Sequence, residues 1–370
     1  MRGAAILMVV AFHAFYTNPE SGKLIHAVGS IVGMGWLGVP IFFVLSGFLI
    51  SYPFFRQRTA NSRFWYLNGY VLRRIGKIIP PFYLSIVVFA VYYILRFSDL
   101  AYLQSALQWA VGLPNFFPST LLFNISYWSL VVEAHFYILL PLLFLLVRGL
   151  NLRHTALFLF FVLFAVPLVA RQLTWPDQPF TKDSVVFLMQ RFPCQLDFFA
   201  WGILFSWVFV SASSARENLR ALSLLGYVGL ILLLTSIGLG ALWSDLFDFL
   251  AHPTRWSTEV FHLLPGVSVF LMLFFVFDPD CLGARLLANP ILRFVGIVSY
   301  EWFLFHGPIV YLFKDAFGQT HGSLIMFALK TVLPLVLSFG ISVLVYRYFS
   351  LPLINRIRGI RRNTPAAGQS

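Results

Sequence analysis

Apolar stretches about as long as a membrane-spanning helix recur ten times in this sequence of 370 residues. Crossing the hydrocarbon core of a bilayer takes about 20 helical residues. Only 11% of the residues are charged, against about 25% in soluble domains. Within lipid the backbone is satisfied only in helices or closed barrels, and these runs are too long for barrel strands. We therefore predict an all-α integral membrane protein with about ten transmembrane helices. The predicted spans are residues 2–16, 28–53, 78–96, 128–147, 155–170, 184–210, 222–243, 259–277, 291–313 and 323–346.

Basic residues are divided unevenly between the two sides that ten alternating spans define. One side comprises the N-terminus and the connections that follow even-numbered spans, and it carries 18 Lys and Arg residues. The other side carries six. Because Lys and Arg accumulate in cytoplasmic loops, we predict that both termini are cytoplasmic and that the protein lies in an inner or plasma membrane. The net charge of +12 then reflects topology, and we expect no nucleic-acid partner. A membrane domain is predicted at residues 2–348, followed by a basic, partly disordered cytoplasmic tail at 349–370.

The first predicted span places two ionisable side chains on one helical face. Arg2 and His13 are eleven residues apart, so they return to within about 20° of each other around the helix and are separated by roughly 16 Å along it. An ionisable group inside a span is costly and needs a partner or a water-filled cavity, which makes His13 a candidate functional residue. The alternative is a neutral His13 that hydrogen-bonds to a neighbouring helix.

A cationic cluster, Arg73, Arg74 and Lys77, stands at the cytoplasmic edge of the third span, with i,i+3 and i,i+4 spacings. It indicates either an ordinary anchor on anionic lipid or a site for an anionic cytoplasmic ligand, because arginine suits phosphate geometry.

Glu133 lies within the fourth span, with Ser129 and Tyr137 one turn before and after it on the same face. A buried carboxylate must be neutral or paired. Glu133 and His13 are both expected in the external half of the bilayer, so the carboxylate can pair with that imidazole. It can equally pair with an arginine, such as Arg191, in a structural role.

Small and polar residues mark two other spans. In the second span, Gly47 favours a close helix contact, and Ser46 can hydrogen-bond a substrate or its own backbone. In the ninth span, Ser299 and His306 are seven residues apart and share a face.

Taken together, five segments in order resemble the acyltransferase-3 family of integral-membrane acyltransferases. They are Arg2 with His13, GVPIFFVLSGFLI, RRIGKIIPPFY, WSLVVEAHFYILLP and SYEWFLFHGP. The resemblance extends over about residues 2–348. It implies about ten transmembrane helices and transfer of an acyl group, usually acetyl, from cytoplasmic acyl-CoA to a hydroxyl of a carbohydrate, glycolipid or other small acceptor.

The resemblance also assigns residues. The family's arginine and histidine fall on Arg2 and His13, its basic pair on Arg73 and Arg74, and its glutamate on Glu133. Three features depart from the family. Lys77 stands where arginine is more usual, and Glu301 stands where a small or apolar residue is commoner. Family members also carry several residues before the arginine, so we expect either that the natural N-terminus lies upstream of Met1 or that this end of the first helix is trimmed.

Acyl transfer to a hydroxyl needs a base with a pKa near neutrality, and His13 is the candidate, with a covalent acyl carrier as its alternative role. Glu133 is its predicted charge partner. The predicted donor-binding residues are Arg2, Arg73, Arg74 and Lys77. The predicted residues for the acceptor, pore or oxyanion are Ser46, Trp128, Ser129, Tyr137, Ser299 and His306. Acyl-CoA is the expected co-substrate, and we expect no metal and no tightly bound cofactor.

Two other classes of function stay open. A transporter or flippase of a polar or glycan substrate would use Glu133, Asp197 and Arg191 as proton or substrate relays. A structural membrane protein would use the same polar residues as contacts between helices.

Overall fold

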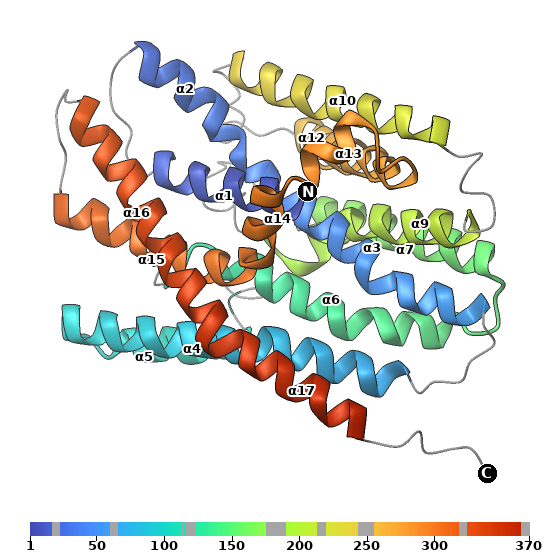
Figure 1. Cartoon of the computed structure of the whole chain (residues 1–370), viewed down its shortest axis with the longest axis horizontal. Coiled ribbons are helices and arrows are strands. Elements are labelled where there is room, and N and C mark those ends of the chain that lie inside the picture. The colour runs from blue at the N-terminus through green and yellow to red at the C-terminus, as the bar shows by residue number, and fades with distance from the viewer. Residues whose placement is uncertain are drawn as a thin grey trace.

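The protein is a bundle of helices whose long members run side by side (Figure 1). The computed structural model describes residues 1–16, 23–59, 66–112, 114, 123–174, 190–212, 220–242, 255–317 and 324–363, and within these ranges it contains helices and no strand. The helices are α1 (Arg2–Tyr16), α2 (Lys23–Gly33), η1 (Met34–Leu37), α3 (Gly38–Thr59), α4 (Tyr66–Phe97), α5 (Ala101–Ala110), α6 (Tyr127–Leu146), α7 (Leu152–Leu173), η3 (Phe192–Gln195), α9 (Leu196–Ser211), α10 (Ser223–Leu242), α12 (Arg255–Met272), η5 (Leu273–Phe277), α13 (Leu282–Leu287), α14 (Pro290–Ile297), α15 (Ser299–Phe317), α16 (Leu324–Val345), η6 (Tyr346–Ser350) and α17 (Leu351–Asn363).

Seven helical segments in the described ranges are long and apolar enough to cross a membrane. They are Val28–Gln57, Gly76–Phe97, Tyr127–Leu146, Leu152–Leu173, Phe192–Ser211, Arg220–Ala241 and Leu329–Ile357. The all-helical, multi-pass character is thus confirmed. Two more predicted spans coincide with the shorter apolar helices Arg2–Phe15 and His262–Phe277. The count of ten crossings and the cytoplasmic location of both termini stay predictions.

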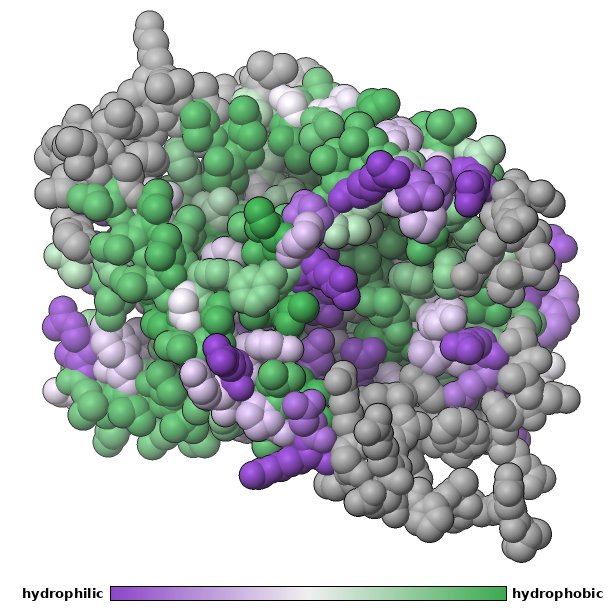
Figure 2. Space-filling view, viewed as in Figure 1, coloured by the Kyte–Doolittle hydropathy of each residue, from purple (hydrophilic) through white to green (hydrophobic). Residues whose placement is uncertain are grey.

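The outer surface of the bundle is apolar, as contact with lipid requires. Leu95, Ile138, Leu146, Leu173 and Ile231 are between 62% and 80% exposed. Figure 2 shows apolar side chains over much of one face of the molecule, interrupted by polar groups.

The ninth predicted span is divided into two helices. Pro290 begins α14, the side chain of Asn289 caps it by accepting from the Leu292 amide, and the helix ends at Ile297. A new helix, α15, then starts at Ser299. The division lets α14 cross the start of α1, where a Cβ on Gly3 would lie only 2.0 Å from the Leu292 carbonyl oxygen. The N-terminus of α1 is therefore held against α14, which leads directly into α15.

A glycine seam joins α3 to α9. A Cβ on Gly47 would lie 2.3 Å from the carbonyl oxygen of Phe199, and one on Gly202 would lie 2.1 Å from that of Val44. Small residues let membrane helices approach to backbone contact, so the helix contact predicted for Gly47 is confirmed. The seam fixes α3, which carries Ser46, against α9.

The beginning of the predicted tail is helical. After a π-helical turn at Tyr346–Ser350, α17 continues from α16 and packs on α4, where a Cβ on Gly76 would lie 1.8 Å from Cδ1 of Ile357. The last predicted tail residues, 364–370, lie outside the described ranges.

Candidate functional site

His13 of α1 and His306 of α15 form a direct pair in the interior of the bundle. His13 Nδ1 lies 2.8 Å from His306 Nε2, and the two rings are stacked with centroids 5.0 Å apart. His306 is fully buried. The sequence places both residues in the candidate site but does not indicate that they touch, because 293 positions separate them.

The hydrogen-bond network fixes the tautomer of both rings. His306 Nδ1 lies 2.9 Å from the carbonyl oxygen of Trp302. A carbonyl only accepts, so His306 Nδ1 carries the proton and its Nε2 is an acceptor in the neutral ring. His13 Nδ1–H therefore donates to His306 Nε2, which leaves His13 Nε2 as the basic nitrogen.

The turn before α6 supports this pair. The hydroxyl of Ser126 lies 3.3 Å from His306 Nε2, and the Asn124 side chain donates to the Leu304 carbonyl at 2.9 Å while it accepts from the Ser126 amide at 3.0 Å. Asn124 and Ser126 are buried. Sequence reasoning missed both residues, although the polar Asn124-Ile125-Ser126 segment directly before an apolar span is a visible signal.

Glu133 of α6 accepts hydrogen bonds from the hydroxyls of Ser46 and Tyr137. Ser46 comes from α3 and Tyr137 from the next turn of α6, so the carboxylate is held between two helices. Ser46 thus bonds a carboxylate, a partner the sequence did not suggest. Contact between Glu133 and His13 is not among these bonds, and a role for Glu133 beside His13 stays a prediction.

Three of the four predicted donor-binding cations converge near Glu133. The Lys77 ammonium interacts electrostatically with the charges of Arg2, Arg74, Glu133 and Glu301. The Arg74 guanidinium lies 5.1 Å from the centre of the Tyr137 ring, and that of Arg2 lies 5.7 Å from the centre of the Phe42 ring. The fourth cation, Arg73, is on the same helix, α4, but its side chain lies outside the described part of the structure.

A small cavity of about 20 Å³ lies beside these groups. It is lined by Arg2, Val39, Phe42, Phe43, Ser129, Leu130, Glu133, Ser299, Tyr300 and Phe303. Four predicted site residues therefore face one space, and Trp128 packs behind it against Phe43, with ring centroids 6.2 Å apart. Arg2 Nε is buried and has no hydrogen-bond partner among the described residues. A buried N–H group left without a hydrogen bond is costly, so a hydrogen-bond acceptor placed in the cavity would stabilise Arg2.

One aromatic residue connects the cavity to the histidine pair. Phe303 lines the cavity, lies edge-on to His306 with centroids 5.7 Å apart, and contacts Phe42 at 6.0 Å. Helix α1 runs alongside with Arg2 at one end and His13 eleven residues on, about 16 Å away. The arrangement places Arg2 at one end of α1 and the histidine pair near its other end.

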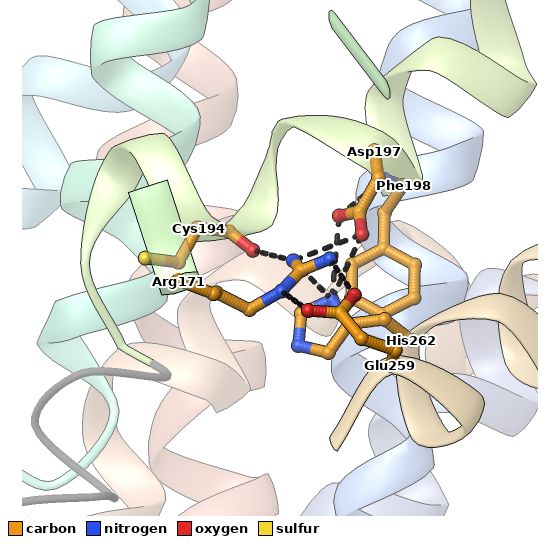
Figure 3. A network of polar contacts seen from close by, with 6 residues as sticks. All are labelled: Arg171, Cys194, Asp197, Phe198, Glu259 and His262. Carbon is orange, nitrogen blue, oxygen red and sulfur yellow. Dashed lines mark hydrogen bonds and ion pairs between the residues drawn. The ribbon is translucent and has the colours of Figure 1, made fainter. Parts of the chain in front are cut away.

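A second polar cluster lies between α7, α9 and α12 (Figure 3). Arg171, fully buried, donates to both Glu259 oxygens at 3.0 and 2.5 Å, to Asp197 at 3.0 Å and to the Cys194 carbonyl at 2.7 Å. His262 Nδ1 lies 3.1 Å from Asp197 Oδ2. Of this cluster the sequence singled out only Asp197, since Arg171 reads as a loop-edge cation. The cluster joins the end of α7 to the beginnings of α9 and α12. Within the described ranges, no three His, Cys, Asp or Glu side chains are arranged to hold a metal ion.

The chain is similar in sequence to known acyltransferases. Residues 1–347 match the family model described as an acyltransferase domain. The peptidoglycan O-acetyltransferase OatA of Listeria monocytogenes is 25% identical over 98% of this chain, and the chain spans 57% of that relative's length. The putative acetyltransferase ORF330 of Acidianus two-tailed virus is 24% identical over 83% of this chain and 80% of its own length. No solved structure matches the chain.

Proposed function

Because this chain belongs to the acyltransferase-3 family of integral-membrane acyltransferases, we propose that it transfers an acyl group, usually acetyl, from cytoplasmic acyl-CoA to a hydroxyl of a carbohydrate or carbohydrate-bearing acceptor. The proposal places the protein in an inner or plasma membrane with both termini in the cytoplasm. The observation that carries it is the pairing of His13 with His306 beside a cavity that Arg2 lines.

His13 Nε2 acts as the general base. The acceptor oxygen forms an ester bond to the acyl carbon as the bond from that carbon to the CoA sulfur breaks. His13 Nε2 takes the hydroxyl proton and returns it to the leaving thiolate. His306 Nε2 keeps its hydrogen bond from His13 Nδ1, which orients the ring and stabilises the imidazolium that forms.

Arg2, Arg73, Arg74 and Lys77 bind the phosphates of the donor. Arginine and lysine form short, charge-assisted hydrogen bonds with phosphate, and the unpaired Arg2 Nε supplies one of them. The roughly 16 Å from Arg2 to His13 are comparable to the reach of an extended phosphopantetheine arm. Phosphates held near Arg2 would therefore place a thioester near His13.

The hydroxyl groups around the cavity position the acceptor or the oxyanion of the transition state. Ser129 and Ser299 face the cavity, and Glu133 holds the Ser46 and Tyr137 hydroxyls beside it. In this proposal Glu133 organises the acceptor end of the cavity and balances nearby cations. His306, the remaining imidazole, is the partner of the base.

Acceptor-dependent turnover of a thioester tests the function. The purified protein in detergent is incubated with acetyl-CoA and with extracts that contain candidate glycan acceptors, and free CoA is measured. We expect CoA release only with both substrates, together with acetyl ester on the acceptor. Movement of a glycan across vesicles without CoA release would instead identify a transporter and refute the proposal.

A further inference from the structure

Glu301 is a buried carboxylate in the first turn of α15, directly after two residues that line the cavity, Ser299 and Tyr300. It is 3% exposed, and its charge interacts with those of Lys77 and Arg2. The function proposed above gives it no role. A carboxylate beside cations that are meant to bind phosphate has the wrong sign for that task, so its presence requires an explanation.

Two contacts made by neighbouring residues bring the start of α15 close to these cations. The Tyr300 hydroxyl donates to the Ile78 carbonyl at 2.8 Å, which fixes α15 on α4 next to Lys77. At the other side, a Cβ on Gly296 would lie 3.6 Å from the Arg2 Cβ, so the end of α14 contacts the start of α1. Glu301 is thus placed between α4 and α1 by packing of its neighbours.

The charges of the described cluster nearly cancel. Arg2, Arg74 and Lys77 contribute three positive charges, and Glu133 and Glu301 contribute two negative charges. Glu133 accepts two hydroxyl hydrogen bonds. Glu301 lies beside the Ser350 hydroxyl of η6, and its charge interacts with those of the cations Lys77 and Arg2. Glu301 is therefore the carboxylate that most directly offsets the attraction of this cluster for an anion.

We propose that Glu301, by offsetting the charges of Lys77 and Arg2, limits how tightly the donor site retains CoA. The inference rests on the proposed function. Acyl-CoA and free CoA carry the same phosphates, so a more positive site would bind substrate and product more tightly alike. Such uniform binding does not accelerate chemistry, and it slows product release, which often limits turnover. Glu301 prevents this by keeping the excess positive charge small.

The test is CoA binding by calorimetry in detergent, with Glu301→Gln compared with the parent. Removing one negative charge near the phosphates is expected to tighten CoA binding roughly tenfold at low salt, with a smaller gain at high salt, and to lower kcat and the donor KM together. Glu259→Gln is the matched control, since Glu259 pairs with Arg171 outside this site, and its CoA affinity should equal that of the parent. Unchanged or weaker CoA binding by Glu301→Gln overturns the inference.

A double variant keeps the test decisive if Glu301→Gln alone does not fold. Removing both members of a buried charge pair is tolerated better than removing one. Lys77→Met should bind CoA about tenfold more weakly, and Lys77→Met with Glu301→Gln should return to near the parent affinity because the net charge is restored. A double variant that binds no better than Lys77→Met overturns the inference and leaves the donor assignment standing. A parent protein that binds no CoA refutes the proposed donor, and this inference with it.

Discussion

Replacing Arg171 with methionine is expected to destabilise the bundle strongly. The guanidinium is 1% exposed and donates to Glu259, Asp197 and the Cys194 carbonyl. Its loss leaves Asp197, 4% exposed, with His262 and a backbone amide as its hydrogen-bond partners. Removing one partner from a buried ion pair costs about 3–5 kcal/mol. Glu259 is 20% exposed and regains contact with water, so Asp197 carries most of this cost.

The measurement is thermal unfolding in detergent, followed by tryptophan fluorescence. Arg285→Met is the matched control, because Arg285 pairs with Asp280 at 3.6 Å and the two side chains are 68% and 76% exposed. An exposed pair contributes about 0–1 kcal/mol, so the control should unfold within about 2 °C of the parent. We expect Arg171→Met to unfold at least about 5 °C lower.

If an uncompensated carboxylate causes the loss, then adding Asp197→Asn to Arg171→Met should restore part of the stability, since removing a whole pair is better tolerated than removing half of it. Equal unfolding temperatures for Arg171→Met and Arg285→Met would refute the reasoning. A double variant less stable than Arg171→Met would show that the cost does not come from a buried, unpaired charge.

Three further predictions concern the seam and the site. Gly202→Leu should prevent stable folding, because a Cβ at this position would lie 2.1 Å from a backbone oxygen of α3. Gly238→Ala is the control and should melt like the parent, because no atom lies within 4 Å of a Cβ placed there. Equal melting temperatures of the two variants would refute the close contact between α3 and α9. Tyr137→Phe removes one of two hydroxyls that bond Glu133 and should lower transfer several-fold without altering the melting temperature. Unchanged transfer would remove that hydroxyl from the site. Arg74→Gln should raise the donor KM, with a smaller effect at higher ionic strength because salt screens the interaction with phosphate. Unchanged CoA affinity in calorimetry would reassign Arg74 to membrane anchoring.

The membrane architecture is largely readable from the sequence because span length and apolarity are local properties. Every predicted span overlaps a helix of the structure. The division of the ninth span at Val298 was missed, because the helix-start signals Asn289 and Pro290 mark only the beginning of α14. An apolar run on both sides of Val298 hides the break.

The site was partly predictable, because helical periodicity placed Arg2 and His13 on one face and Ser129, Glu133 and Tyr137 on another. Which faces meet depends on tertiary packing. Depth in the membrane allowed Glu133 to reach His13, yet the structure shows Glu133 bonded to hydroxyls and His13 to an imidazole of α15.

The buried cluster around Arg171 was the least predictable feature. Arg171 lies near a span end, where the sequence pattern is that of an exposed loop residue. Its partners Asp197, Glu259 and His262 lie 26 to 91 positions away. Only the packing of α7, α9 and α12 shows that it is enclosed.

The central claim is that His13, oriented by His306, takes the proton of the acceptor hydroxyl. Replacing His13 with glutamine and measuring acceptor-dependent CoA release in purified, folded protein tests it most directly. His154→Gln is the matched control, because His154 is exposed and bonded to Asn151 at the start of α7. We predict a loss of roughly 100-fold or more for His13→Gln, the contribution of a positioned base, and a control within a few-fold of the parent. Transfer by His13→Gln within a few-fold of the parent would contradict the assignment of His13 as the base.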